Sequence, residues 1–215
     1  VDNAPETDLT ITLSNGATIV IAAGETTGTS SAFAIQGDDP YVDGSVETLT
    51  IDSTAGGNYE QLDATDTALV TVEDTIDATT VSFNDPVVDE GGNITLTATL
   101  DNPADGALTI NLDNGETITI ADGASSGSVT FLAPDDVYQG GNDFDVAIDS
   151  TSGGNFEQLI TNDVANITVN DDLDTTTISI DDVTVDEGSG TATIDASVDN
   201  APETDLTITL SNGAT

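Results

Sequence analysis

The chain has 215 residues, of which 41 are Asp or Glu and none is Lys, Arg or His, so its formal net charge at pH 7 is -41. A surface of one negative sign is repelled by nucleic-acid phosphates and by anionic lipid headgroups, which argues against both as partners. The absence of Cys excludes disulfides and thiolate metal sites. No apolar run approaches the roughly 20 residues of a membrane-spanning helix, so no direct membrane insertion is expected.

The sequence contains repeats of about a hundred residues. Residues 1–18 recur without change as residues 198–215, and IDSTAGGNYEQL from Ile51 recurs as IDSTSGGNFEQL from Ile148. This length is typical of an autonomous domain and exceeds that of a solenoid repeat. We predict an incomplete repeat over residues 1–77 that lacks its first strands, a complete repeat over residues 78–174, and the beginning of a third over residues 175–215. The identical ends indicate a window cut from a long array.

Apolar and polar residues alternate with a period of two along the complete repeat, as in half-buried β-strands. Thr, Val and Ile dominate these segments, which favours strands. The pair Asn114–Gly115 predicts a two-residue hairpin, and the pairs at 15–16 and 212–213 repeat this signal. The predicted strands are 79–83, 94–100, 108–112, 117–120, 129–131, 144–148 and 164–169.

No part of the chain shows sustained helical periodicity. Seven short strands in about a hundred residues are typical of an immunoglobulin-like sandwich. The predicted fold class is therefore all-β, with tandem immunoglobulin-like β-sandwich domains of about seven strands in a Greek key, joined end to end by short acidic linkers. A domain of this size buries enough apolar surface to fold without disulfides.

The acidic residues gather in loops that the strand directions bring to one end of each repeat. In the complete repeat, the first, third, fifth and seventh strands all finish at the same end, where the next domain begins. The candidate metal ligands at these ends are Asp38, Asp39, Asp43, Glu73, Asp74 and Asp77 in the first repeat, Asp89, Glu90, Asp135, Asp136, Asp171, Asp172 and Asp174 in the second, and Asp186 and Glu187 in the third.

Converging carboxylates need a counter-ion. Two carboxylates about 4 Å apart repel by about 4 kcal/mol at an effective dielectric constant of 20, and several such pairs exceed the ~5–15 kcal/mol that keeps a domain folded. The chain has no cationic side chain to pair them. Oxygen ligands on flexible loops favour Ca²⁺ over Zn²⁺, which prefers His and Cys, and over Mg²⁺, which retains its water. A solvated surface adapted to high salt is the alternative explanation of the acidity.

Several segments together resemble the immunoglobulin-like extender repeats of giant RTX-type bacterial adhesins, and more distantly Calx-beta domains. They are TTISIDDVTVDEG from Thr176, LSNGATIVIAAGETTGT from Leu13, DDPYVDGSVETLTI from Asp38 and STAGGNYEQL from Ser53. The resemblance implies a secreted, extracellular protein of the bacterial cell surface, exported by type I secretion. It also implies Ca²⁺ at the domain junctions, and the matching positions are Asp89, Glu90, Asp135, Asp136, Asp171 and Asp172. The RTX nonapeptide itself is absent.

The sequence predicts no enzyme, because it offers no His, Cys or Lys as base or nucleophile and no glycine-rich phosphate loop. We expect a structural segment of a calcium-stiffened adhesin stalk, which spaces an adhesive domain from the cell and supports attachment or biofilm. Its partners are then neighbouring repeats of the same chain. One alternative is a segment of a self-assembling extracellular filament with like chains as partners. A second is a carbohydrate- or protein-binding β-sandwich module, which would normally display exposed aromatic residues.

Overall fold

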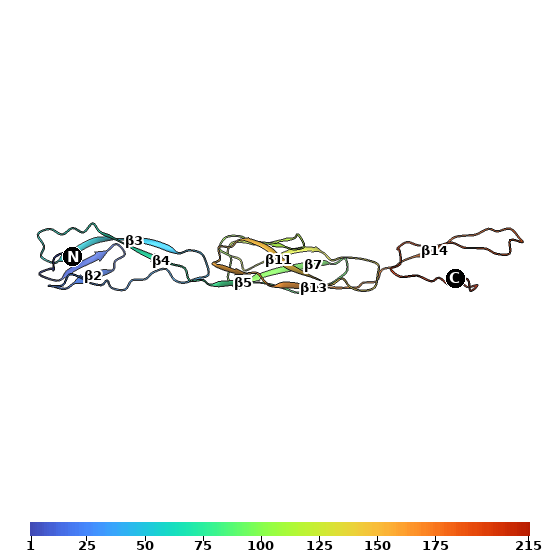
Figure 1. Cartoon of the computed structure of the whole chain (residues 1–215), viewed down its shortest axis with the longest axis horizontal. Coiled ribbons are helices and arrows are strands. Elements are labelled where there is room, and N and C mark those ends of the chain that lie inside the picture. Colours follow the sequence, from blue (N-terminus) through green and yellow to red (C-terminus); the bar gives the residue numbers. More distant parts are fainter. The chain divides into compact units, whose positions relative to one another are not determined.

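The computed structural model describes all residues from Val1 to Thr215 and contains fifteen β-strands and no helix (Figure 1). The all-β prediction is confirmed. Nothing helical is present with the length and apolar character that a membrane crossing requires. The chain forms two compact units, of which unit 1 comprises residues 1–79 and 155–159, and unit 2 comprises residues 80–154 and 160–215. This division differs from the three repeats read from the sequence, because residues 155–159 pack with unit 1 and the third repeat groups with the second.

Two sheets contain the strands from β5 to β13, which belong to unit 2 apart from the first two residues of β5 and of β12. One has four strands in the order β10-β7-β5-β12, and the other has five in the order β6-β13-β11-β8-β9. The pairs β10–β7, β7–β5, β13–β11, β11–β8 and β8–β9 are antiparallel, whereas β6 and β13 are parallel. The strands are β5 (Ala78–Phe83), β6 (Val87–Asp89), β7 (Asn93–Leu100), β8 (Leu108–Leu112), β9 (Thr117–Ile120), β10 (Ser126–Leu132), β11 (Phe144–Gly153), β12 (Gln158–Ile160) and β13 (Val164–Asn170).

The core of unit 2 follows from the alternation of its strands. In β7, Ile94, Leu96 and Ala98 are fully buried, and the Thr residues between them point away from the core. β8 repeats the pattern with Leu108 and Ile110. Because each sheet has one buried apolar face, the two faces enclose a single core, as in a β-sandwich.

All seven strands predicted for the complete repeat are present. The sequence missed β6 and β12, which have three residues each and are too short to show a period of two. It also ended β11 too early. That strand continues through the polar residues 149–153, of which residues 150–153 pair with β8 after an irregularity between Ile148 and Ser150. Backbone pairing with a neighbouring strand extends β11 where side-chain pattern alone predicts a loop.

Unit 1 contains one four-stranded sheet in the order β2-β1-β3-β4. The strands are β1 (Leu9–Leu13), β2 (Thr18–Ile21), β3 (Ser45–Gly56) and β4 (Thr67–Val72). Its buried apolar side chains are Leu9, Ala17, Ile21 and Leu49. The hairpin predicted at Asn15–Gly16 is present, since β1 and β2 pair antiparallel around it. Its turn is not the predicted two-residue type: the Leu13 N–H donates to the Ala17 carbonyl, which leaves residues 14–16 in the loop, and of the pair only Gly16 has a positive φ, of 83°. This core is much smaller than that of unit 2.

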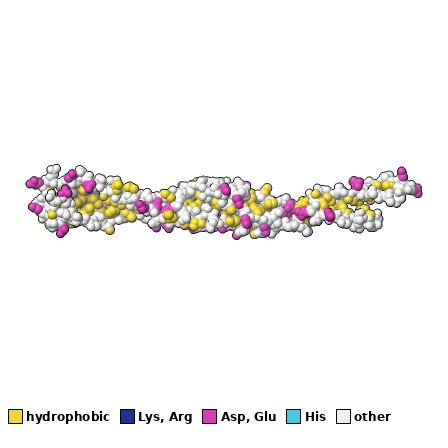
Figure 2. All heavy atoms as spheres, in the orientation of Figure 1, with side chains coloured by type: hydrophobic (Ala, Val, Ile, Leu, Met, Phe, Trp, Pro, Cys, Tyr) yellow, Lys and Arg dark blue, Asp and Glu magenta, His cyan; other side chains and the backbone are white.

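The third repeat contributes one short pair of strands to unit 2. β14 (Ile178–Ile180) pairs antiparallel with β15 (Ala196–Val198). The side chains of both strands lie largely open to solvent. Figure 2 shows hydrophobic side chains exposed along this segment.

Truncation of a core residue of β7 has a predictable cost. Leu96→Ala is expected to lower the free energy of unfolding of unit 2 by about 2–5 kcal/mol, because a fully buried Leu leaves a cavity. Native-state hydrogen exchange of the β7 amides in the full chain measures this loss. Leu132→Ala on the neighbouring strand β10 is the matched control, since Leu132 is 68% exposed and its truncation is expected to change stability by less than about 0.5 kcal/mol. Equal losses in the two variants would contradict the assigned core.

Candidate metal centre

Glu90 is the one buried acidic residue of the chain, with 5% of its surface exposed. It directly follows β6, and its backbone N–H donates to the Asn170 carbonyl at 3.0 Å. The next residue, Gly91, has a φ of 64° and donates to the Pro134 carbonyl. These bonds turn the chain so that the Glu90 side chain points inward. Its Oε1 accepts a hydrogen bond from Asn142 Nδ2 at 3.0 Å, whereas its buried Oε2 has no partner.

Three carboxylates from three separate segments meet at this place. Glu90 comes from the turn after β6, Asp135 from the loop after β10, and Asp172 from the segment after β13. One carboxylate oxygen of each lies within 4.8 Å of the others. Two oxygens bound to the same Ca²⁺ at about 2.3–2.6 Å are at most about 5 Å apart. The spacing of the three oxygens therefore fits a single Ca²⁺.

Burial, and after it the neighbouring charges, raise the pKa values of two carboxyls in this cluster. Burial raises the pKa of Glu90 above its ordinary value of 4.5, and the charges of Asp136 and Asp171 raise it further. Removal from water likewise raises the pKa of Asp172 above 3.8, with further contributions from neighbouring charges, first among them Asp174. Of the seven acids that the sequence placed at this end of the second repeat, Glu90, Asp135 and Asp172 meet directly. The other four, Asp89, Asp136, Asp171 and Asp174, lie near enough for their charges to raise the pKa of Glu90 or of Asp172.

Asn142 is a functional candidate that the sequence analysis missed. Its Nδ2 donates both to Glu90 Oε1 at 3.0 Å and to Asp136 Oδ2 at 3.1 Å. Asp136 also accepts the backbone N–H of Tyr138 at 2.8 Å, and these hydrogen bonds lower the pKa of its carboxyl below 3.8. Asn142 therefore connects two separate segments of the chain, because it holds the carboxylate of Glu90 after β6 and that of Asp136 after β10. A neutral side chain carries no charge signal in the sequence, and only its position in the fold reveals this role.

The double contact of Asn142 leads to a prediction. Asn142→Ala removes a donor from two carboxylates at once, so we expect the metal-free chain to lose about 1–3 kcal/mol of stability, the cost typical of an unsatisfied buried polar group. Thermal unfolding in the presence of a chelator measures the loss. Asn111→Ala is the matched control, because Asn111 lies on β8 and hydrogen-bonds to the Ser150 hydroxyl. An Asn142→Ala variant as stable as this control would contradict the role of the bridge.

The raised pKa values set the direction of the pH dependence without metal. A carboxyl whose pKa is raised by folding stabilises the folded state most when it is protonated. Its contribution to the free energy of unfolding is complete at a pH below its ordinary pKa and is lost as the pH rises through its raised pKa in the folded state. With chelator present, unit 2 is therefore expected to become more stable as the pH falls from neutrality toward about 4.5, the ordinary value for Glu90. The lowered pKa of Asp136 has the opposite effect on stability, because its contribution is lost as the pH falls, but this loss begins only below about pH 3.8. Thermal unfolding at a series of pH values checks this, and Glu90→Gln should flatten the profile.

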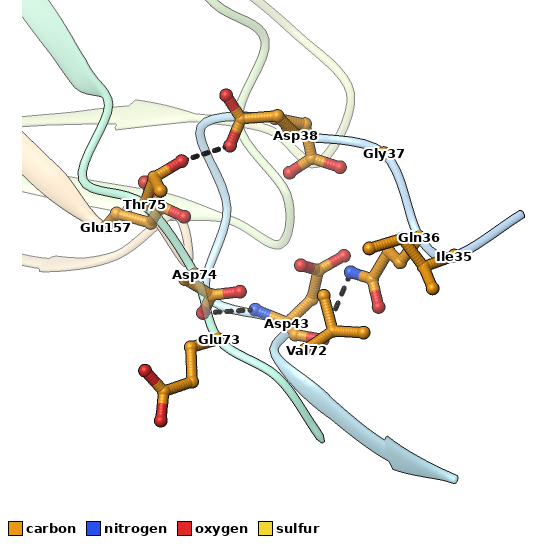
Figure 3. A pocket seen from close by; sticks show the side chains of 11 residues that line it. Ile35, Gln36, Gly37, Asp38, Asp43, Val72, Glu73, Asp74, Thr75 and Glu157 are labelled. Atoms are coloured by element: carbon orange, nitrogen blue, oxygen red, sulfur yellow. Dashed lines mark hydrogen bonds between the residues drawn. The ribbon is translucent and has the colours of Figure 1, made fainter. Parts of the chain in front are cut away.

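Unit 1 has an acidic pocket of about 280 Å³ (Figure 3). Five of the six acids predicted for this repeat line it, namely Asp38, Asp39, Asp43, Glu73 and Asp74. The sixth, Asp77, lies beside the pocket, and its backbone N–H donates to the carboxylate of Glu157 at 2.6 Å. Glu157 also lines the pocket and was not predicted, because it is far from the other acids in sequence and enters unit 1 with residues 155–159.

The carboxylates of this pocket are held by local hydrogen bonds. The backbone N–H of Asp43 donates to Asp74 Oδ2 at 3.2 Å, and the Thr75 hydroxyl donates to Asp38 Oδ1 (Figure 3). None of the acids is buried, and no three of them bring ligand atoms as close together as Glu90, Asp135 and Asp172 do. The pocket concentrates negative charge, but its carboxylate oxygens are not as close together as those of Glu90, Asp135 and Asp172 in unit 2.

The third repeat places its two predicted acids differently. Asp186 and Glu187 lie in an exposed turn after β14, where the Asp186 carbonyl accepts the backbone N–H of Ser189 at 3.1 Å. The structure does not bring them together with another acidic loop. They correspond by sequence to Asp89 and Glu90.

The repeated β-structure and the acidic loop ends define a modular, acidic β-repeat protein. The LapA domain family matches residues 1–75, 77–172 and 174–215. The chain therefore belongs to the LapA domain family, a family of biofilm adhesins, which agrees with the resemblance noted in the sequence. This membership indicates an adhesin-related function and a cell-surface or extracellular location, and the family is in general non-enzymatic. No curated protein matches the chain.

Proposed function

We propose that this chain is a structural, non-catalytic stalk segment of an extracellular adhesin and that Ca²⁺ bound by Glu90, Asp135 and Asp172 stiffens it. The stalk spaces an adhesive domain from the cell and supports attachment or biofilm. The observation that carries the proposal is the buried, unpartnered Oε2 of Glu90 beside two further carboxylates. Membership of the LapA domain family supports the adhesin part of the proposal.

The unpartnered oxygen favours a cation over a merely solvated acidic surface. Buried polar groups in proteins are almost always hydrogen-bonded, and buried charges are paired or coordinate a metal. The chain contains no Lys, Arg or His that could reach Glu90. Water alone would leave three close carboxylates to repel one another. A bound cation removes the repulsion and satisfies Oε2 at the same time.

The donor set favours Ca²⁺ among the common cations. All three groups are carboxylates, whereas Zn²⁺ sites generally include His or Cys, and the chain has neither. Ca²⁺ takes about six to eight oxygens in irregular geometry, so further ligands have to come from neighbouring carboxylates, backbone carbonyls or water. Asp89, Asp171 and Asp174 are the nearby acids available for this. Mg²⁺ requires a stricter octahedral geometry that loops of this kind do not pre-form.

The cation would stiffen the chain because it joins the segment after β13 to two loops of unit 2. Asp172 belongs to residues 171–174, which follow β13 and have no regular secondary structure. A cation that joins Asp172 to Glu90 and Asp135 ties this segment to two loops of unit 2. Without the cation, repulsion within the cluster drives the segment away from those loops. Ca²⁺ therefore limits the conformations of the chain as it leaves β13.

Calcium titration of the full chain tests the proposal. We expect saturable Ca²⁺ binding by calorimetry, a higher melting temperature, and a larger maximum dimension in small-angle scattering than with chelator. Ca²⁺ at a hundred times its Kd adds about 2.7 kcal/mol to the free energy of unfolding. Mg²⁺ at the same concentration should restore little of either effect. Unchanged melting and dimensions with and without Ca²⁺ would overturn the proposal.

The aromatic residues favour the structural role over a carbohydrate-binding module. The ring of Tyr41 packs on that of Phe156, with centroids 5.8 Å apart. The Tyr138 hydroxyl donates to the Ala201 carbonyl at 2.7 Å, and that of Tyr59 donates to the Asn3 carbonyl. Each Tyr is half-buried and makes a contact within its own unit, whereas a sugar-binding platform normally presents a fully exposed aromatic ring.

A further inference from the structure

Residues 155–159 lie in the second repeat by sequence, yet they pack with unit 1. The chain leaves unit 1 after Thr79, returns to it with this segment, and passes into unit 2 again at Ile160. Unit 1 is therefore composed of the first repeat together with a distant piece of the second. The two repeats are thus not folded as separate blocks of sequence.

Backbone hydrogen bonds join this piece to the loop before β3, residues 38–43, which we call the tyrosine loop. The N–H of Val42 donates to the Asn155 carbonyl, and the N–H of Glu157 donates to the Pro40 carbonyl, both at 3.0 Å. These two bonds enclose a single antiparallel bridge, as neighbouring bonds of a β-ladder enclose one pair of opposed residues. The Glu157 carboxylate also accepts the backbone N–H of Asp77 at 2.6 Å.

Tyr41 and Phe156 are the two residues of this bridge. Side chains approach most closely at such a pair, because the residues themselves are not hydrogen-bonded to each other. The two rings are tilted by 31° with their centroids 5.8 Å apart, which is within the ~4.5–7 Å range of favourable aromatic pairs. Both side chains are half-buried. The contact therefore combines paired backbone groups with a specific contact of two rings.

A sharp turn at the end of β11 presents Phe156 to the tyrosine loop. Gly153, Gly154 and Asn155 have consecutive positive φ values of 85°, 82° and 51°. A Cβ atom at Gly153 would lie 2.1 Å from the Ala107 carbonyl oxygen, so only glycine fits there. A positive φ is uncommon for a residue other than glycine, and it persists where the surrounding structure determines it. We call residues 153–157 the aromatic turn.

Both halves of the contact recur in the other repeat with the same local conformation. Gly56, Gly57 and Asn58 have φ values of 83°, 82° and 58°, and an aromatic residue follows them as well. The sequence Asp-Asp-x-Tyr recurs too. The backbone N–H of Tyr41 and that of Tyr138 each donate to the carboxylate of the second Asp of this sequence, at 3.0 and 2.8 Å. The aromatic turn and the tyrosine loop are therefore parts of the repeat itself.

We propose that the aromatic turn of a repeat binds the tyrosine loop of the repeat before it, and that this contact couples the folding of neighbouring repeats. The partner of the tyrosine loop is thus a segment of the following repeat of the same chain. The stability of each repeat then includes a nearest-neighbour contribution, as in other repeat proteins. The contact consists of backbone bonds and aromatic rings, so it requires no Ca²⁺ and is separate from the cluster around Glu90.

Native-state hydrogen exchange of the full chain in chelator tests the proposal. We expect Phe156→Ala to raise the exchange rates of the β3 and β4 amides in unit 1 about tenfold, because it removes the ring contact and the apolar burial that goes with it. Phe156 is outside the buried core, so the variant should still fold. Phe156→Tyr is the matched control, since it keeps a ring and should exchange like the parent chain. Faster exchange in β11 and β12 alone, or in no segment, would overturn the proposal.

A double-mutant cycle shows whether the two rings act together. Tyr41→Ala is expected to give a similar acceleration in β3 and β4, and the double variant with Phe156→Ala should exchange little faster than either single variant. Accelerations that multiply in the double variant would mean that the rings act independently, and they would overturn the proposal.

Calcium titration separates this inference from the stalk proposal. Phe156→Ala should bind Ca²⁺ as the parent chain does, because no part of the ring contact belongs to the cluster of Glu90, Asp135 and Asp172. Glu90→Gln should weaken Ca²⁺ binding and leave the exchange of β3 and β4 in chelator unchanged. Failure of the calcium site would thus leave the coupling between repeats intact, and failure of the coupling would leave the calcium site intact.

Discussion

Glu90→Gln is expected to weaken Ca²⁺ binding at least about tenfold and to remove most of the calcium-dependent rise in melting temperature. Loss of a residue that only orients a metal ligand typically costs about 10- to 100-fold in affinity, and loss of a ligand itself should cost no less. The same substitution is expected to raise stability in chelator, because Gln has nearly the same shape and removes a buried charge that has no counter-ion. The variant should thus be more stable than the parent without Ca²⁺ and respond less to its addition.

Calorimetric titration and thermal unfolding of the full chain measure both effects. Asp149→Asn is the matched control, because it also removes one carboxylate from an exposed position in the middle of β11 that lies outside the cluster. Its Ca²⁺ affinity should equal that of the parent chain. If Glu90→Gln bound Ca²⁺ as tightly as this control, the assignment of Glu90 as a ligand would be wrong. A decrease in stability in chelator would show that the buried carboxylate has another partner.

Gly141→Ala is expected to disrupt the acidic cluster from a position that binds no ion. A Cβ atom at Gly141 would lie 1.7 Å from the Val169 carbonyl oxygen, so the loop has to move away from β13. The neighbouring residues Asn142 and Asp143 would move with it. Asn142 bridges Glu90 and Asp136, and Asp143 accepts the backbone N–H of Val169 at 2.9 Å. We expect a loss of about 3 kcal/mol or more, as for severe overpacking with the loss of hydrogen bonds.

Chemical unfolding of the full chain, with hydrogen exchange at β13, measures this loss. Gly37→Ala is the control, because a Cβ at Gly37 meets no atom within 4 Å and its φ is not positive. Ca²⁺ affinity of Gly141→Ala should also fall, since the bridge between the two loops is displaced. A variant with unchanged exchange at β13 would contradict the close approach of the loop to this strand.

The amino-acid sequence alone determined the seven main strands of the second repeat and the composition of the loops. A period of two requires no tertiary information, because alternate side chains of a strand point to opposite faces. It therefore placed all seven main strands of the second repeat. The order of the strands also sufficed to bring Glu90, Asp135 and Asp172 to one end, since consecutive antiparallel strands reverse direction.

Only the tertiary structure decided which acid is buried and what holds it. Asp89 and Glu90 are adjacent in sequence, yet the turn after β6 buries only Glu90. Asn142 and Glu157 reach their sites through loop packing, which carries no local sequence signal. Burial depends on which strands face a residue, and this is a property of the assembled sheets that one segment of sequence does not contain.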